Sequence, residues 1–276
     1  MMNNFTQRTI TGAVYVLLLI ASVIVGKWTF LILFFLIHLR AMYEYFKMIA
    51  PSGKLTFTAY AVIAASLLAY FLASAVALDY ININYLVLLL PLIFILLILI
   101  LLSPAERTQL TGGSMLFPLI YITTPMLFLI FTAFNEGSYN AILVMIPLAL
   151  IWINDTFAYL AGKLLGKHKI FPVLSPHKTW EGFIGGILFT VLAALVFPVW
   201  IKGGNVLQWI SLALMVSLTG TAGDLFESAL KRARGIKDSS NLLPGHGGIL
   251  DRIDSFLFVI PFYFVYIKLF IYAFSF

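Results

Sequence analysis

Residues 82–102 read NINYLVLLLPLIFILLILILL, a stretch without a single charged side chain. A hydrocarbon core about 30 Å thick needs about 20 helical residues to cross it. This stretch is therefore long enough and apolar enough for one transmembrane helix. Eight further stretches are predicted to span a membrane in the same way: 10–26, 28–49, 57–77, 114–134, 139–162, 183–201, 206–228 and 253–274.

The composition of the whole chain supports this reading. Of its 276 residues 62% are apolar and 10% are charged, and the mean hydropathy is +1.04. A soluble domain carries about a quarter charged residues, so most of this surface must face lipid. We expect an all-α polytopic membrane protein with about nine transmembrane helices. No cleavable signal peptide is expected, because the first apolar run leads directly into a second.

The breaks between the predicted spans carry turn-forming residues. Gly26-Lys27 separates the first two runs, which together are too long for one span and suit a tight helical hairpin. Polar residues with Pro, Gly or Ser mark three further breaks, at 51–54, 103–107 and 135–138.

The basic residues predict the orientation. Nine spans place the termini on opposite sides, and Lys and Arg gather on the cytoplasmic side. The other face has Lys27 and Lys202, with Lys268 inside or beyond the last span. We therefore expect a cytoplasmic N-terminus and an outside C-terminus. The formal charge of +6 then reflects loops near anionic lipid, and nucleic acid is not expected as a partner. Fourteen of the 17 Lys and Arg fall on the predicted cytoplasmic side: Arg8, Arg40, Lys47, Lys54, Arg107, Lys163, Lys167, Lys169, Lys178, Lys231, Arg232, Arg234, Lys237 and Arg252.

The chain divides by composition near residue 138. Residues 1–138 hold about five spans with short loops. Residues 139–276 hold about four spans and two long polar loops, 163–182 and 229–252. Long loops in so apolar a chain are candidates for function, so we expect the catalytic region there. The absence of cysteine excludes thiolate metal sites and cysteine nucleophiles.

Acidic residues flank the second long loop. Asp224, Glu227, Ser228 and Lys231 are spaced i, i+3, i+4 and i+7, which places them on one stripe of a helix. They lie at the predicted cytoplasmic end of span 206–228.

A second acidic pair, Asp251 and Asp254, begins the last span with Arg252 between them. Hard divalent cations such as Mg²⁺ take carboxylate oxygens and share them with substrate phosphates. The alternative is that these acids simply favour the positive end of a helix dipole.

The loop between the acids is basic and rich in glycine. Residues 231–238 read KRARGIKD and residues 243–248 read LPGHGG. Clustered cations complement phosphate charge, and glycines let backbone N–H groups approach a phosphate closely. The alternative is a loop that contacts lipid head groups, in which His246 has a structural role.

Residues 175–182, SPHKTWEG, combine a cation, two hydroxyls, an aromatic ring and an acid. They suit a nucleotide or phosphate clamp, or an interfacial Trp beside a capped helix.

Asp155 lies inside span 139–162, where a carboxylate costs about 2.5–3.5 kcal/mol. It needs a polar cavity or a partner such as Lys163 or the metal. We expect residues 154–182 to meet the 224–254 segment.

Residues 228–254, SALKRARGIKDSSNLLPGHGGILDRID, resemble the signature of the phosphatidate cytidylyltransferases, also called CDP-diacylglycerol synthases. SPHKTWEG at 175–182, NDTFAYLAGKLLGK at 154–167 and the start RTITG at 8–12 also resemble family segments. His177 departs from the family, in which many members carry a lysine or asparagine. The signature match runs through Ser228, Lys231, Arg232, Lys237, Asp238, Pro244, His246, Gly247, Gly248, Asp251, Arg252 and Asp254.

The resemblance implies an inner-membrane enzyme of phospholipid biosynthesis with its site facing the cytoplasm. It would join CTP and phosphatidic acid to give CDP-diacylglycerol and pyrophosphate. It implies Mg²⁺, held by Asp224, Asp251 and Asp254, and leaves open K⁺ as a second ion and a homodimer. Lys231 joins these three acids as a catalytic residue. The residues implied in substrate binding are Asp155, Ser175, Lys178, Thr179, Glu181, Ser228, Arg232, Lys237, His246, Gly247, Gly248 and Arg252.

Two other functions compete with this one. An ion-coupled transporter could use Asp155, Asp224 and Asp254 as an ion path, but these acids gather at one interface and no inverted repeat is present. A membrane transferase acting on a different lipid phosphate is the second alternative.

Overall fold

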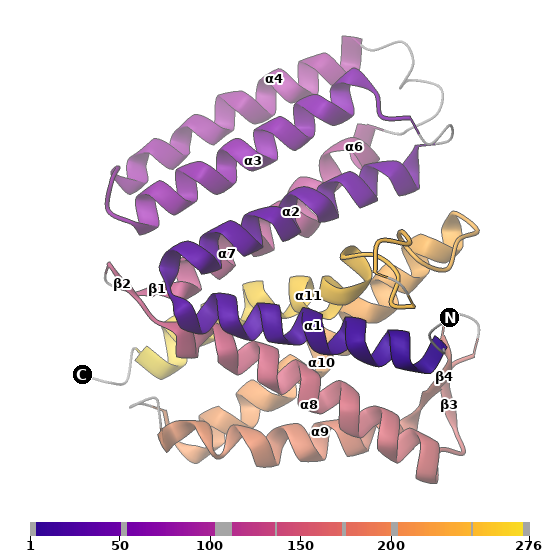
Figure 1. The fold of residues 1–276 in the computed structure, drawn as a ribbon. Helices are drawn as coiled ribbons and strands as arrows, with labels where there is room; N and C mark the ends of the chain where they lie inside the picture. The colour runs from indigo at the N-terminus through magenta and orange to yellow at the C-terminus, as the bar shows by residue number, and fades with distance from the viewer. Residues whose placement is uncertain are drawn as a thin grey trace. The chain divides into compact units, whose positions relative to one another are not determined.

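The computed structural model describes residues 4–50, 54–102, 112–135, 137–172, 175–199, 204–243 and 245–272. Figure 1 traces its helices from the N-terminus to the C-terminus. The predicted breaks at 51–53 and 103–107, and Lys202 and Pro244, lie outside the described residues. The chain forms two compact units: Met1–Ala141 with Asp238–Arg252, and Ile142–Lys237 with Ile253–Phe276.

Within the described residues, regular structure is almost entirely helical. Two short antiparallel hairpins, which the all-α prediction did not include, pair β1 (Phe134–Asn135) with β2 (Ser138–Tyr139) and β3 (Lys169–Phe171) with β4 (Ser175–Thr179). Short 3₁₀ or π turns are η1 (Ile83–Leu88), η2 (Leu119–Thr123), η3 (Phe197–Val199) and η4 (Ile267–Tyr272). The α-helices are α1 (Asn4–Val25), α2 (Lys27–Ile49), α3 (Phe57–Ala77), α4 (Leu89–Leu102), α6 (Gly112–Pro118), α7 (Thr124–Ala133), α8 (Ala141–Leu165), α9 (Trp180–Ala194), α10 (Val206–Ala233) and α11 (Leu250–Tyr266).

The described helices identify an integral membrane protein. Seven stretches are long and apolar enough to cross a membrane: Lys27–Ile49, Phe57–Ala77, Met115–Ala133, Ala141–Leu165, Trp180–Val199, Val206–Ala233 and Leu250–Ile271. Each coincides with a predicted span. The other two predicted spans match shorter apolar helices, Ile10–Val25 and Ile83–Ile93. The count of nine and the orientation of the termini therefore remain predictions.

In the first unit the chain reverses at Gly26, as predicted. Helix α1 ends at Val25 and α2 begins at Lys27. Gly26 has a φ of 152°, a conformation that favours glycine. Helix α2 packs against α1, α3 and α7, and α3 packs against α4. Large side chains of α2 form much of this core and are almost completely buried: Phe30, Phe34, Met42, Tyr45 and Phe46.

The first unit also contains a polar cluster within its apolar core. Ser66 Oγ lies 2.7 Å from both His38 Nε2 and Thr123 Oγ1. All three side chains are buried, and buried polar groups are costly unless they are hydrogen-bonded. Because they come from α2, α3 and η2, these contacts tie three helical segments together.

In the second unit, glycines allow helices to approach closely. A Cβ on Gly182 of α9 would lie 2.6 Å from the Ala158 carbonyl oxygen of α8. A Cβ on Gly223 of α10 would lie 2.7 Å from the Asp254 carbonyl oxygen of α11. Neither position has room for a side chain. The second contact brings the polar end of α10 against the start of α11.

The two predicted long loops are wrong in part. Helix α8 continues to Leu165, and α9 begins at Trp180, so the β3–β4 hairpin occupies most of the predicted loop 163–182. The pairing of Lys169 with Thr179 stabilises this hairpin. Helix α10 continues to Ala233, which makes Lys231 and Arg232 helical. Polar residues thus extend these helices beyond the apolar stretches on which the predicted boundaries rested.

Candidate active site

The polar end of α10 carries the predicted stripe of charged residues. Lys231 Nζ donates to Glu227 Oε2 over 2.6 Å, across one helical turn. Glu227 is fully buried and the Lys231 side chain is nearly so. A buried carboxylate needs a partner of opposite charge, and Lys231 supplies it. The i, i+4 spacing predicted from the sequence therefore produces a real contact.

Asp224, at the start of the same stripe, forms an ion pair with Lys178 of β4. Both side chains are partly exposed, Lys178 by 27% and Asp224 by 39%. The predicted meeting of the 154–182 and 224–254 segments is thereby confirmed for these two residues. The pair therefore lies at the protein surface, where a phosphate could approach it.

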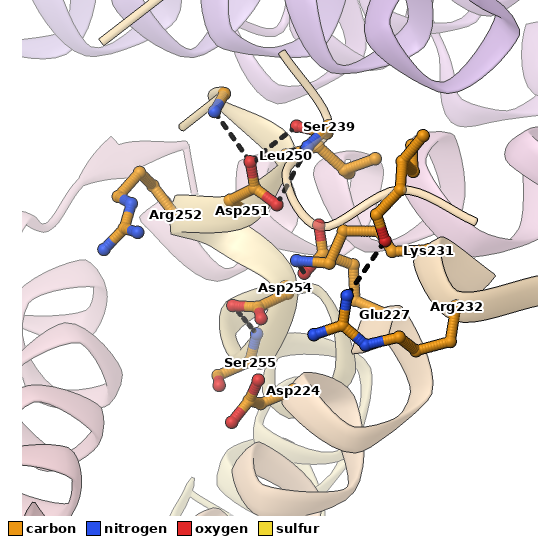
Figure 2. Close-up of polar contacts among 12 residues, drawn as sticks. Asp224, Glu227, Lys231, Arg232, Ser239, Leu250, Asp251, Arg252, Asp254 and Ser255 are labelled. Carbon is orange, nitrogen blue, oxygen red and sulfur yellow. Dashed lines mark hydrogen bonds and ion pairs between the residues drawn. The ribbon is translucent and has the colours of Figure 1, made fainter. Parts of the chain in front are cut away.

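Asp254 faces the same stripe from α11. It is 9% exposed, and its Oδ1 accepts a hydrogen bond from the Ser255 backbone N–H over 2.7 Å. It lies within interaction range of Asp224 and Lys231. Figure 2 shows Asp224, Glu227 and Asp254 on the neighbouring turns of α10 and α11.

Five charged side chains of the second unit thus gather at one place. They are the carboxyl groups of Asp224, Glu227 and Asp254 and the ammonium groups of Lys178 and Lys231. Among the described ranges, no set of three or more Asp, Glu or His side chains is placed to share a metal ion. Mg²⁺ commonly takes one or two protein carboxylates and completes its shell with water and substrate phosphate, so Asp224 and Asp254 suit it chemically.

Asp251 belongs to the first unit, where its carboxylate organises the glycine-rich loop. Oδ2 accepts hydrogen bonds from the Ser239 N–H and Oγ, both over 2.9 Å, and from the Gly248 N–H over 2.7 Å. Figure 2 shows these bonds to Asp251 at the start of α11. Gly247, with a φ of 80°, turns the chain into this arrangement. Asp251 therefore holds both ends of the loop 239–248.

Glu44 of α2 was missed by the sequence analysis. It is fully buried, yet it accepts hydrogen bonds from Ser240 Oγ over 2.7 Å and from the Leu250 backbone N–H over 2.9 Å. Ser239 Oγ and Arg40 Nε also donate to it, over 3.1 and 2.9 Å. A signal was available, because Arg40 and Glu44 form an i, i+4 pair within a predicted span, where charged residues mark function.

The clamp predicted at residues 175–182 has several structural contacts. Thr179 Oγ1 accepts from the Gly182 N–H over 3.2 Å and caps α9. Glu181 accepts from the Lys167 N–H over 3.0 Å, and its Oε1 lies 2.6 Å from His168 Nδ1. The capped helix that the sequence offered as an alternative is therefore present. A role for Thr179 and Glu181 in nucleotide binding stays a prediction.

The remaining predicted residues divide between the two units. Arg232 donates to the Ile236 carbonyl over 3.0 Å, and Arg252 donates to the His246 carbonyl over 2.9 Å. The second unit holds Asp155 on α8, Ser175 on β4, Ser228 and Arg232 on α10, and Lys237. The first unit holds His246, Gly247, Gly248 and Arg252 with Asp251.

Comparison with known proteins places this arrangement in context. A family model described as "Cytidylyltransferase family" matches residues 6–270. The chain belongs to the cytidylyltransferase family. This match includes every predicted site residue from Asp155 to Asp254, and also Glu44.

The curated proteins that resemble this chain include several named phosphatidate cytidylyltransferase. The Staphylococcus saprophyticus protein is 40% identical over 170 residues, which cover 61% of this chain and 64% of that protein. The proteins of Staphylococcus epidermidis (strain RP62A) and Staphylococcus aureus (strain COL) are 48% and 50% identical, over 119 and 120 residues, and each match covers 43% of this chain and 46% of the relative. The chain thus spans between about half and just under two thirds of these relatives.

Proposed function

We propose that the protein transfers the cytidylyl group of CTP to phosphatidic acid, giving CDP-diacylglycerol and pyrophosphate. The cluster of Lys178, Asp224, Lys231 and Asp254, inside a cytidylyltransferase family match that spans nearly the whole chain, carries this proposal. The printed name of the staphylococcal relatives supplies the substrate class.

The reaction brings two anions together. An oxygen of the lipid phosphate attacks the α-phosphorus of CTP and forms a new P–O bond. The bond between the α-phosphorus and its bridging oxygen breaks, and pyrophosphate leaves with the electron pair. A phosphate monoester has a second pKa of about 6, so at neutral pH it is already a nucleophile and needs no side chain as a base.

Such a transfer depends on positioning and on neutralising negative charge. Lys178 and Lys231 supply two ammonium groups beside the carboxylates of α10 and α11. Arg232 and Lys237 follow on the same segment and add two more cations. We infer that these four side chains hold the triphosphate and the lipid phosphate.

Mg²⁺ fits the carboxylate oxygens of Asp224 and Asp254, and when bound it would offset charge on the reacting phosphates. Asp251, one helical turn before Asp254 on α11, stays a predicted third ligand, although the described residues do not place three carboxylates around one metal ion. Its Oδ2 accepts from the Ser239 N–H and Oγ and from the Gly248 N–H, and its Oδ1 also contacts the Ser239 N–H, over 3.2 Å. K⁺ is the candidate for a second ion.

The proposed site faces the cytoplasm, at the surface of the inner membrane. CTP reaches it from water and phosphatidic acid reaches it from lipid. The predicted orientation, with a cytoplasmic N-terminus and an outside C-terminus, puts 14 of the 17 basic residues on this side.

The test is direct. Purified protein in phosphatidic acid vesicles receives CTP labelled at the α-phosphate, with Mg²⁺. We expect label to enter the lipid fraction as CDP-diacylglycerol, with an equal amount of pyrophosphate released. Transfer to another lipid phosphate, but not to phosphatidic acid, would identify a different transferase. Ion flux without any release of pyrophosphate would contradict the proposal altogether.

A further inference from the structure

Glu44 lies in a fully occupied hydrogen-bond site of the first unit. Its Oε1 accepts from Arg40 Nε and Ser240 Oγ, and its Oε2 accepts from Ser239 Oγ and the Leu250 N–H. An ionised carboxylate has about four lone-pair positions, so all of them are used. Three of the four donors belong to the segment 239–250, which joins α10 to α11.

Ser239 connects Glu44 to Asp251. Its Oγ lies 3.1 Å from Glu44 Oε2 and 2.9 Å from Asp251 Oδ2. A serine hydroxyl has one proton to donate, so the two carboxylates share a single donor. Any change at Glu44 therefore alters the hydrogen bonding of Asp251.

Gly248 shows how closely the loop is fitted to Glu44. A Cβ added at Gly248 would overlap Glu44 Oε2 and Ser239 Oγ. The backbone of the glycine-rich turn thus passes directly over the carboxylate. Gly248 is not among the glycines with positive φ. Glycine is needed at this position because the backbone passes too close to the Glu44 carboxylate to leave room for a side chain.

We propose that Glu44 is a positioning residue of the active site. It holds the segment 239–250 to α2, and through Ser239 it fixes the carboxylate of Asp251. This inference rests on the proposed function for its catalytic consequence, but the anchoring of the loop stands independently of it.

The experiment replaces Glu44 by glutamine. The glutamine amide has one acceptor oxygen and one donor nitrogen. At least one of the donors that bond to Glu44 would therefore face an N–H group of the glutamine. Hydrogen exchange measured by mass spectrometry on the full-length protein reads the loop directly. We expect amide exchange in residues 239–250 to become about tenfold faster, as the loss of one hydrogen bond to a charged group implies. Exchange in α3 should be unchanged.

Kinetics of Glu44→Gln then test the consequence for the reaction. We expect kcat to fall about 10- to 100-fold, the usual effect of losing a group that orients a ligating carboxylate. We expect the KM for phosphatidic acid to stay within about twofold, because Glu44 is buried and cannot touch the lipid. Glu44→Asp keeps the charge and should recover part of kcat and of the protection of the loop.

Ser66→Ala is the matched control, because it removes buried hydrogen bonds of the same unit without touching the loop. It should change neither exchange in 239–250 nor kcat. If Glu44→Gln does not fold, the double variant Ser239→Ala/Ser240→Ala removes both serine contacts of Glu44 from the side of the loop, together with the contact of Ser239 Oγ with Asp251. Wild-type exchange and wild-type kcat in Glu44→Gln, or in the double variant, would overturn the proposal. Faster loop exchange in Glu44→Gln, combined with a wild-type protein that makes no CDP-diacylglycerol, would instead contradict the proposed function alone.

Discussion

Lys178, near the end of β4, forms an ion pair with Asp224 on α10. The segment that leads into α9 and the polar end of α10 therefore meet at one pair of opposite charges. Because both side chains are partly exposed, the pair suits contact with a soluble nucleotide better than it suits stabilisation of the fold.

We predict that Lys178→Ala separates activity from stability. Partly exposed ion pairs contribute about 0–1 kcal/mol, so the unfolding temperature should change little. Activity should fall at least about tenfold, because a cation is lost beside the reacting phosphates. Thermal unfolding and steady-state kinetics with varied CTP measure the two effects. Lys169→Ala, on the paired strand β3, is the control and should keep its activity. A large loss of stability without loss of turnover would show that Lys178 is structural.

Asp254→Asn should abolish turnover while the protein still folds. The decrease in turnover should be greater than the about 10- to 100-fold decrease seen when a residue that only hydrogen-bonds to a metal ligand is replaced. Asp79→Asn provides a control, since Asp79 is exposed and its φ of 60° is one that asparagine tolerates. The readouts are single-turnover formation of CDP-diacylglycerol and binding of Mg²⁺ by calorimetry. Near-normal turnover in Asp254→Asn would remove the metal assignment.

Asp251→Asn should behave differently from Asp254→Asn. Asparagine would set an N–H group against the donors of Ser239 or Gly248, so the loop should loosen as activity is lost. Hydrogen exchange in 239–248 should rise for Asp251→Asn and stay at the wild-type level for Asp254→Asn. Equal exchange in both variants would refute the role of Asp251 in the loop.

Two glycine substitutions test the fit of the signature loop. Gly248→Ala should inactivate the protein, because the new methyl group overlaps Glu44 and Ser239. Gly235→Ala should cost about 1–2 kcal/mol for its left-handed backbone, yet keep activity, since a Cβ there meets open space. Measuring the activity and the unfolding temperature of both variants separates the steric effect at Gly248 from the backbone effect at Gly235. An active Gly248→Ala protein would mean that the loop can move away from α2.

The predicted orientation can be tested in a chain that has no cysteine of its own. We expect Tyr80→Cys, in the exposed turn after α3, to react with an impermeant maleimide added outside the cell. Lys169→Cys, on β3, should react only after the membrane is opened. Labelling of both positions from the same side would contradict the predicted topology.

Local spacing made part of the site predictable. Asp224, Glu227 and Lys231 repeat with the period of a helix, so one stripe of charges follows from the sequence alone. The hairpin at Gly26 was predictable because a glycine interrupts an apolar run too long for one span. Hydropathy likewise located the seven long spans, since each of them contains an apolar window of 18 residues with at most two charged side chains.

Contacts between distant segments were not predictable in this way. Nothing near Glu44 in the sequence indicates Ser239 or Ser240, because their hydrogen bonds join residues 195 and 196 positions apart. The role of Glu181 was missed for a related reason. Its partners Lys167 and His168 come into reach only through the β3–β4 hairpin, whose short strands carry little signal of their own.

The contacts of Glu44 also have a consequence for biosynthesis. Its partners Ser239, Ser240 and Leu250 are made 195 to 206 residues later. Chains are synthesised at about 5–20 residues per second. About 10–40 s therefore pass between the synthesis of Glu44 and the synthesis of these partners. During this interval, Arg40 is the one donor to the Glu44 carboxylate, of the four described, that has been synthesised. The first helices therefore enter the membrane with an unfinished polar site, which is completed when one of the last segments of the chain returns to it.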